Sequence, residues 1–450
     1  MCSKIVTFTL AFVFGLALRP VAAQVPETFA KIWNDAALQE RMRLNIEQHR
    51  KGDAVIQVVD LAGKPVPEAT LVIQQRSHEF LFGCNLFVLG QLSTTELNAR
   101  YESAFTNLFN FATVPFYWAD LEPEQGKPRF AEGSPYVWRR PPPDRLVKWC
   151  LAHGITPKGH ALMYVKNMFM PAWTARNDPQ TLRVQSAKHM AEIAGRYGRD
   201  IPIWDVVNED IPRRRDTNQW PAVGADFLPW SFREAGRLLP KQARLLINDG
   251  THEAHDTPGV YEALIKGLQQ EGAPVNGIGI QFHVYNRAGV LNGKSLPPAQ
   301  ISAVYERFGK LGLPLYITEI TVPGNGDNGA ELQAAIVENL YRLWFSTPGI
   351  AGVTWWNLGD GAAFQEENKA LGGLLDKDMK PKPAYLALDR LINTEWKTAL
   401  RLESDAAGKV SFRGFLGKYS IRITVGANTR DYAFNLSRSS VPSLTTFQLD

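Results

Sequence analysis

Two glutamates, each directly after a short apolar segment, are the residues of this sequence best placed to do chemistry. Ile203-Trp-Asp-Val-Val-Asn208 precedes Glu209, and Leu315-Tyr-Ile-Thr318 precedes Glu319. Apolar, β-branched segments of this length are typical of buried parallel strands. A single glutamate at such a strand end could cap a helix or pair with an arginine. Two that face each other can cleave a glycosidic bond, and we expect this pair to do so.

The spacing of the two glutamates indicates the elements that position them. They lie 110 residues apart, which three βα units of roughly 35–40 residues would span in a (β/α)₈ barrel of about 250–300 residues. In that fold the catalytic groups lie at the C-terminal ends of the strands. The two glutamates are therefore predicted at the ends of the fourth and seventh strands.

The rest of the chain agrees with this fold class, an α/β (β/α)₈ barrel. Strand patterns recur at 80–83, 109–114, 155–161, 203–208, 244–248, 275–282, 315–318 and 350–355. Helical patterns lie between them, among them 145–152, 180–195, 230–239, 260–270 and 329–345. An open doubly wound sheet is the alternative, but no glycine-rich phosphate loop follows the first strand.

The segments that flank the barrel predict a small accessory antiparallel β-sandwich. Residues 27–50 have the pattern of one helix, and 54–60 with 69–74 that of a β-hairpin. Residues 395–450 alternate apolar and polar side chains, and this β appendage is too short for a core of its own. We divide the chain into a signal peptide (1–23), an N-terminal helix and hairpin (24–78), the catalytic barrel (79–393) and the C-terminal appendage (394–450).

The N-terminus and the composition indicate an exported protein. Lys4, the apolar segment 5–18 and Val21-Ala-Ala23 have the order of a signal peptide, so we expect a secreted or periplasmic protein. Cys84 and Cys150 are predicted to be buried free thiols. A net charge of +4 without basic runs predicts neither a nucleic-acid nor a membrane partner. No metal or cofactor is expected, since the histidines lack ligand spacing, and we expect a monomer.

Several motifs, in one order along the chain, are similar to those of a known family. Trp204-Asp-Val-Val-Asn-Glu-Asp210 closely resembles the acid/base motif of the glycoside hydrolase family 10 endo-β-1,4-xylanases. Five further runs resemble motifs of the same family: 158–162, 246–249, 279–283, 317–319 and 374–385. The resemblance covers about residues 77–392. It implies a retaining β-glycosidase that acts internally on a xylan-like polysaccharide or oligosaccharide, with Glu209 as acid/base and Glu319 as nucleophile.

The resemblance also implies residues that bind the sugar. Asn208 would bind the sugar 2-hydroxyl, His283 would hold Glu319 ionised and Trp356 would stack on a sugar ring, whereas Trp355 would face away. Each polar residue has a structural alternative, as a strand-end amide or a core histidine. The full set of predicted binding residues is Asn208, His160, His283, Gln281, Trp356, Tyr117 and Tyr164.

Departures from the family motifs concern the sugar-binding residues. The family's strand-two run, with a Glu, an Asn and a Lys that hold the sugar, is here Thr113-Val-Pro-Phe-Tyr-Trp118. Tyr164 and Val165 stand where the family has Trp and His, and Thr321 where many relatives have Asp. Glycosidase chemistry is therefore better supported than xylan specificity. A decorated or different β-glycan, or a glycan-binding barrel without turnover, are the alternatives.

A run of three arginines, Arg213 to Arg215, follows the acid/base motif. Charge runs usually form a solvated loop. The more specific hypothesis is that these arginines bind the uronic acids of a decorated polysaccharide. We also expect poor activity on unsubstituted xylan, because the strand-two run lacks the Glu, Asn and Lys with which the family holds the sugar.

Overall fold

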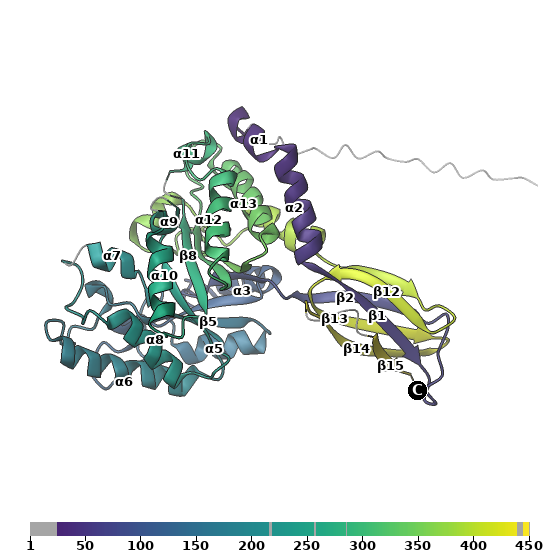
Figure 1. Cartoon of the computed structure of the whole chain (residues 1–450), viewed down its shortest axis with the longest axis horizontal. Helices are drawn as coiled ribbons and strands as arrows, with labels where there is room; N and C mark the ends of the chain where they lie inside the picture. Colours follow the sequence, from purple (N-terminus) through teal and green to yellow (C-terminus); the bar gives the residue numbers. More distant parts are fainter. Residues whose placement is uncertain (1–24, 216–217, 256–257, 285, 439–443, 450) are drawn as a thin grey trace, which may run out of the picture.

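Eight parallel strands close into a barrel, which confirms the predicted (β/α)₈ fold (Figure 1). The structure is a computed structural model that describes residues 25–215, 218–255, 258–284, 286–438 and 444–449. The strand order around the barrel is β10-β3-β4-β5-β6-β7-β8-β9. The strands are β3 (Leu81–Asn85), β4 (Phe111–Pro115), β5 (Thr156–Met163), β6 (Ile203–Asn208), β7 (Arg244–Asp249), β8 (Gly277–His283), β9 (Leu315–Thr321) and β10 (Ile350–Trp355).

Helices surround the barrel and connect its strands, and the five helical patterns predicted from the sequence correspond to α5, α6, α8, α10 and α13, although α8 ends one residue before the predicted 239. The longer helices are α3 (Thr95–Leu108), α5 (Pro143–Ala152), α6 (Pro179–Tyr197), α8 (Phe227–Leu238), α10 (Val260–Gln270), α12 (Pro298–Gly309), α13 (Gly329–Ser346) and α14 (Pro383–Arg390). The shorter ones are α4 (Trp118–Leu121), α7 (Asp210–Arg215), α9 (Thr251–His255), α11 (Arg287–Leu291), η1 (Asn167–Phe169), η2 (Gln365–Ala370) and η3 (Leu391–Glu395).

The register between β5 and β6 is fixed by one close contact. Gly159 lies beside Trp204, and a Cβ at this glycine would come within 2.1 Å of the tryptophan ring. Only glycine lets the ring pack this closely against the neighbouring strand. Because side chains alternate along a strand, this register brings the next pair, His160 and Asp205, to the inside of the barrel.

The flanking segments form the predicted sandwich, but not through a hairpin. One sheet has the order β12-β1-β15 and the other β11-β2-β13-β14, so β1 and β2 lie in different sheets. Each instead pairs with C-terminal strands, which offer more ladder partners than a two-stranded ribbon would. β15 is parallel to β1, so the sandwich is not wholly antiparallel. The strands are β1 (Lys51–Val59), β2 (Thr70–His78), β11 (Ala399–Glu403), β12 (Lys409–Phe415), β13 (Gly417–Val425), β14 (Asn428–Leu436) and β15 (Leu444–Gln448).

The single helix expected over 27–50 is two helices, α1 (Glu27–Trp33) and α2 (Ala36–His49). Asp35 ends the continuity, because its side chain accepts a hydrogen bond of 2.8 Å from the amide of Leu38 and caps α2. Arg50 follows α2 and is buried against the barrel, where it donates to the carbonyl oxygens of Phe345 and Ile350 at 2.6 and 2.8 Å. Arg50 therefore ties the sandwich side of the molecule to the barrel.

The remaining predictions on chain organisation divide into tested and untested ones. Cys84 on β3 and Cys150 on α5 are buried free thiols, as predicted. Burial raises the pKa of Cys150 to about 12, so it is unreactive at neutral pH. The predicted signal peptide lies outside the described residues. Within the described part of the chain, no helix is long and apolar enough to cross a membrane.

Candidate active site

A cavity of about 180 Å³ opens at the C-terminal ends of the barrel strands. Both predicted catalytic residues and all seven predicted binding residues of the main set line it: Tyr117, His160, Tyr164, Asn208, Glu209, Gln281, His283, Glu319 and Trp356. Trp355, the neighbour predicted to face away, packs into the hydrophobic core. The cavity is also lined by residues that the sequence analysis missed: Phe87, Arg139, Arg140, Phe169, Phe364 and Glu367.

Glu209 follows the last residue of β6 and has a left-handed backbone, with φ of 57°. This conformation is uncommon for a residue with a Cβ and is often found at functional sites. The Glu209 amide donates to the carbonyl oxygen of Asn248 at 2.9 Å. The Tyr164 hydroxyl donates to Oε2 at 2.6 Å, and Gln281 Nε2 lies 3.4 Å from Oε1. The side chain is thus contacted by two residues that line the cavity.

The pKa of Glu209 is raised above its usual value. Burial is the largest cause, because it disfavours the charged form; the hydrogen bond from Tyr164 lowers the pKa in part, and the charge of Glu319 raises it again. Glu209 therefore tends to keep a proton that a neighbouring oxygen could take.

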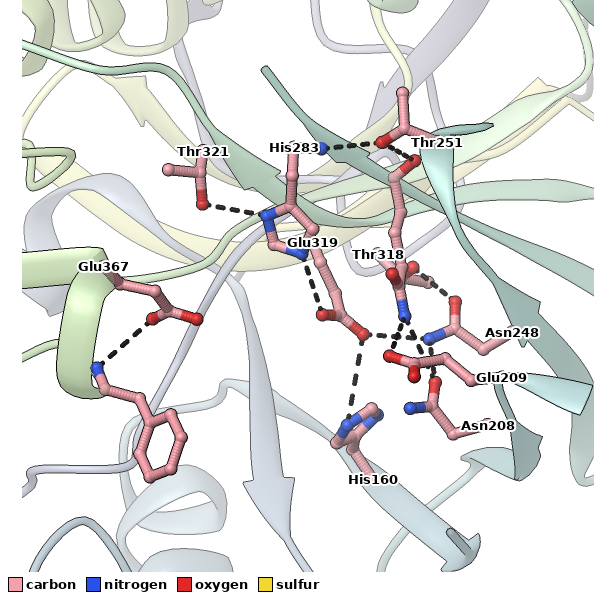
Figure 2. Close-up of polar contacts among 12 residues, drawn as sticks. His160, Asn208, Glu209, Asn248, Thr251, His283, Thr318, Glu319, Thr321 and Glu367 are labelled. Atoms are coloured by element: carbon pink, nitrogen blue, oxygen red, sulfur yellow. Dashed lines mark hydrogen bonds and ion pairs between the residues drawn. The ribbon is translucent and has the colours of Figure 1, made fainter. Parts of the chain in front are cut away.

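Glu319 lies within β9, two residues before the strand ends, rather than after the strand as the sequence suggested. Its Oε1 accepts a hydrogen bond from Asn248 Nδ2 at 2.9 Å, and its Oε2 lies 3.2 Å from His283 Nε2 (Figure 2). Burial alone would raise the pKa of this carboxyl. The hydrogen bond from His283 and the charges of His160, His283 and Lys158 outweigh burial, so the pKa is lowered. Glu319 is held in the charged form.

Asn248 links the two strand ends, although the sequence analysis gave it no role. Its Nδ2 donates to Asn208 Oδ1 at 2.7 Å as well as to Glu319, and Thr318 donates to its Oδ1 at 2.5 Å. Asn208 Oδ1 is therefore occupied, whereas its Nδ2 donates to none of the residues that the structure describes. That amide group is free to donate to a sugar hydroxyl in the cavity.

A buried ion pair lies beneath the site. Lys158 Nζ and His160 Nδ1 are 2.5 and 2.7 Å from the same oxygen of Asp205, and Lys158 and Asp205 are fully buried. Burial would raise the pKa of Asp205, but Lys158 and His160 lower it overall. The contact turns His160 Nε2 toward Glu319 Oε1, 4.0 Å away. Period-two alternation along β5 could have predicted this arrangement, since Lys158 and His160 are two residues apart.

Two residues that depart from the family motifs make hydrogen-bond contacts within the site. Tyr164, in place of Trp, supplies the hydroxyl that contacts Glu209. Thr321, in place of Asp, has its hydroxyl 3.0 Å from His283 Nδ1, so a neutral group holds the histidine that contacts Glu319.

The cavity has two unlike walls. We call His160, Asn208, Glu209, Gln281, His283 and Glu319 the carboxylate wall; these residues lie on or directly after β5, β6, β8 and β9. We call Phe87, Arg139, Arg140 and Glu367 the arginine wall; these lie in the segments that follow β3, β4 and β10.

The arginine wall is held in place by specific contacts. Arg139 Nη1 donates to Asn357 Oδ1 at 2.9 Å and to the carbonyl oxygen of Ala362. Arg140 Nε donates to Asp120 at 2.8 Å, and its guanidinium lies 4.0 Å from the ring centroid of Tyr117. Burial, with the nearby charge of Arg140, lowers the pKa of Arg139 to about 10, so Arg139 is charged at neutral pH. This wall lies in loops that match no family motif, so the sequence gave no signal for it.

Arg213 to Arg215, the predicted uronic-acid contacts, are not among the cavity-lining residues that the structure describes. They form the last turn of α7, where Arg213 and Arg214 pair with the buried Asp210 at 2.6 and 2.5 Å. The arrangement matches neither expectation in full, because the arginines are helical rather than in a loop and two of them pair with Asp210 outside the cavity. Within the described residues, no group of three His, Cys, Asp or Glu side chains is arranged to hold a metal ion.

A (β/α)₈ barrel with two glutamates in one cavity at its mouth has the architecture of a barrel glycoside hydrolase. Comparison with known families agrees with this class. The sequence model described as glycosyl hydrolase family 10 matches residues 85–390. The chain belongs to this family.

Several relatives are similar over most of the chain. The anti-sigma-I factor RsgI6 of Acetivibrio thermocellus is 27% identical over 405 residues, which cover 90% of this chain and 49% of the relative. Endo-1,4-beta-xylanase 1 of Arabidopsis thaliana is 22% identical over 87% of this chain and 38% of its own length. The chain therefore spans less than half the length of both. The crystal structure of xylanase 10B from Thermotoga petrophila in complex with xylobiose superimposes with a TM-score of 0.57, at 22% identity, over 70% of this chain and 95% of that one.

Proposed function

We propose that the protein is a retaining β-glycoside hydrolase of the endo-xylanase type, with Glu209 as acid/base and Glu319 as nucleophile. One observation carries the proposal: two glutamates of one cavity have pKa values shifted in opposite directions, Glu209 upward and Glu319 downward. Such a pair supplies a proton donor and an ionised carboxylate at the same pH.

The reaction then proceeds in two displacements. The ionised Glu319 carboxylate attacks carbon-1 of the sugar while Glu209 gives its proton to the departing glycosidic oxygen, so the C–O bond to the leaving group breaks as the glycosyl-enzyme forms. Glu209, now ionised, takes a proton from water, whose oxygen attacks carbon-1 and releases Glu319. The product keeps the configuration of the substrate.

A retaining mechanism needs the two carboxyl groups about 5–5.5 Å apart, whereas an inverting one needs roughly 6.5–9.5 Å to admit a water. We expect a separation of about 5–6 Å. Proton NMR of the first product anomer tests the mechanism directly. An α-anomer released first from a β-linked substrate would contradict the proposal.

The proposed substrate is xylan or a decorated xylan-like polysaccharide. The family supports a β-glycan, and several relatives are named as endo-1,4-beta-xylanases. The absence of the Glu, Asn and Lys of the family's strand-two run favours a decorated chain, since of the residues present there only Tyr117 lines the cavity, whereas Phe116 and Trp118 pack into the core. Export is proposed from the N-terminal sequence alone.

A reducing-sugar assay on a panel of β-glycan polymers, with Glu319→Ala as the inactive control, tests this function. We expect the unmodified chain to hydrolyse xylan or a decorated xylan, and the control to hydrolyse neither. Activity only on a glucan would change the substrate class. Binding without turnover on every polymer would instead favour a silent glycan-binding barrel.

A further inference from the structure

The arginine wall lies across the cavity from the proposed acid/base. In the strand order of the closed barrel, β10 is four strands from β6, which carries Glu209 at its end. Arg139 donates to Asn357, which follows β10, and its amide donates to Gln91, which follows β3, at 2.7 Å. In Figure 2, Glu367 of this wall lies on the far side of Glu319 from Glu209.

This position determines which part of the substrate meets the arginines. The leaving group must contact Glu209, because Glu209 protonates its oxygen. The sugar attacked by Glu319, and everything attached to its non-reducing side, then extends away from Glu209 and toward the arginine wall. Arg139 and Arg140 therefore face the glycone, the part that stays on the enzyme after the first step.

The hydrogen bonds of Arg139 leave one edge of its guanidinium unused. Nη1 is satisfied by two neutral oxygens, those of Asn357 and Ala362. Nε is buried and has no hydrogen-bond partner, and Nη2 donates to none of the residues that the structure describes. Nε and Nη2 lie on the same edge of the guanidinium plane, the edge whose two N–H groups match the two oxygens of a carboxylate.

The charges around this edge also favour an anion. Arg139 and Arg140 both lie over the Phe87 ring, at 5.4 and 5.3 Å from its centroid, so two like charges are close together in a buried wall. Asp120 accepts a hydrogen bond from Arg140 Nε. Glu367 is near Arg139, but its Oε2 accepts from Asn357 Nδ2 and the Phe364 amide instead, at 3.0 and 3.2 Å. Among the described residues no carboxylate is bonded to Arg139, which is only 3% exposed, and a buried cation without a bonded counter-charge is unfavourable.

The loop that carries both arginines is held by its own hydrogen bonds. Arg129 Nε donates to the carbonyl oxygen of Pro135 at 2.8 Å, and Gln91 Nε2 to that of Val137 at 2.8 Å. A site whose donors are already fixed loses little entropy when the ligand binds.

We propose that Arg139 and Arg140 form a glycone subsite for a sugar carboxylate, so that the enzyme selects β-glycans whose glycone carries a uronic acid. The inference rests on the proposed function for the direction of the substrate. The sequence suggested the run Arg213–Arg215 for recognition of the acid. We assign this recognition instead to the arginine wall, across the cavity from Glu209. Arg139 supplies the paired N–H groups, and Arg140 adds a second positive charge.

Binding to a chain made inactive by Glu319→Ala tests the subsite without turnover. The ligands are xylotriose and xylotriose that carries a glucuronic acid on its non-reducing terminal xylose, measured by isothermal titration calorimetry. We expect the acidic ligand to bind about tenfold or more tightly than the neutral one, as is typical of charged hydrogen bonds. Adding Arg139→Gln should remove the preference, and adding Arg139→Lys, which keeps the charge but not the paired N–H groups, should retain part of it.

Arg214→Gln is the matched control, because it removes an arginine near the site that pairs with Asp210 outside the cavity. It should leave the preference unchanged. Equal affinity for both ligands in the inactive chain would overturn the proposal, as would a preference that is lost with Arg214→Gln. If Arg139→Gln weakens both ligands equally, the arginine binds neutral hydroxyls and the proposal is wrong. Thermal unfolding confirms that each variant is folded; should Arg139→Gln not fold, Arg140→Gln must reduce the preference.

The outcomes separate this inference from the proposed function. If the unmodified chain hydrolyses no β-glycan but the acidic ligand is preferred through Arg139, the catalytic proposal fails and the subsite stands. If xylan is hydrolysed while the acidic and neutral ligands bind equally, the catalytic proposal stands and the subsite fails.

Discussion

The carboxylate wall and the arginine wall of the cavity are built in different ways. The residues of the carboxylate wall lie on or directly after barrel strands, so that strand register sets their direction. Those of the arginine wall lie in loops and short helical segments that follow β3, β4 and β10, and hydrogen bonds from Arg139 and Arg140 fix them. Groups that must hold a reacting atom within tenths of an ångström benefit from the rigid sheet, whereas loops can vary without disturbing the barrel.

The two walls also differ in their likeness to the family. All six residues of the carboxylate wall lie in runs that resemble family motifs. Residues of the arginine wall match no such run. The proposals for the two walls follow this difference: the family reaction on the carboxylate wall and a changed recognition of the glycone on the arginine wall. Experiments on the two walls should therefore affect different quantities: turnover on one side and substrate preference on the other.

Removing the proposed nucleophile should have the largest effect. Glu319→Ala is expected to lower kcat by on the order of 10⁴-fold or more, because no other group can form the glycosyl-enzyme. Added azide should restore some turnover on activated aryl glycosides and give a product of inverted configuration, identified by NMR. Glu209→Ala should spare the first step with such leaving groups, which need little protonation. Equal loss in both variants on activated substrates would show that the two roles are wrongly assigned.

Breaking the ion pair beneath the carboxylate wall should destabilise the protein more than any surface change. Asp205→Asn leaves Lys158 buried without a counter-charge, and both side chains are fully buried. We expect a loss of about 3–5 kcal/mol in the free energy of unfolding, measured by denaturant titration. Asp226→Asn is the control, because its pair with Arg183 is largely exposed and should contribute about 1 kcal/mol or less. Similar losses in the two variants would contradict the structural role of Asp205.

Comparing substrates sharpens the difference between the walls. The family residues missing from the strand-two run would each contribute about 0.5–1.5 kcal/mol to sugar binding. Together their loss should weaken kcat/KM on linear xylohexaose by roughly two orders of magnitude relative to a decorated polymer. Comparable rates on both substrates would return the protein to ordinary xylanase specificity.

The smallest expected change is a shift in pH dependence. The hydrogen bond from Tyr164 lowers the raised pKa of Glu209 in part, so Tyr164→Phe should raise that pKa further. Because Glu209 must be protonated in the first step, the alkaline limb of the kcat/KM profile should move to higher pH. The acidic limb reports ionisation of Glu319, whose pKa lies below the ordinary 4.5, and should not move. A shift of the alkaline limb to lower pH would contradict the role of Tyr164.

The sequence alone was sufficient for the barrel and for the carboxylate wall. Alternating strand and helix patterns predict the closed sheet, and a strand end fixes the direction of the next side chain within one or two residues. Glu209, Glu319, Asn208 and His283 could therefore be predicted to meet. The errors were local: Asp35 caps a second helix within 27–50, and β1 and β2 found C-terminal partners instead of each other.

Only the tertiary structure brought the arginine wall to the site. Arg139 and Arg140 lie far from the barrel strands in sequence terms, in a loop without periodicity, and contacts with Gln91, Asn357 and Asp120 from three other segments determine where they point. Arg213 to Arg215 follow the acid/base strand directly, yet the adjacent Asp210 holds two of them outside the cavity. Strand residues are positioned by local periodicity, which a sequence displays, whereas loop residues are positioned by long-range contacts, which it does not.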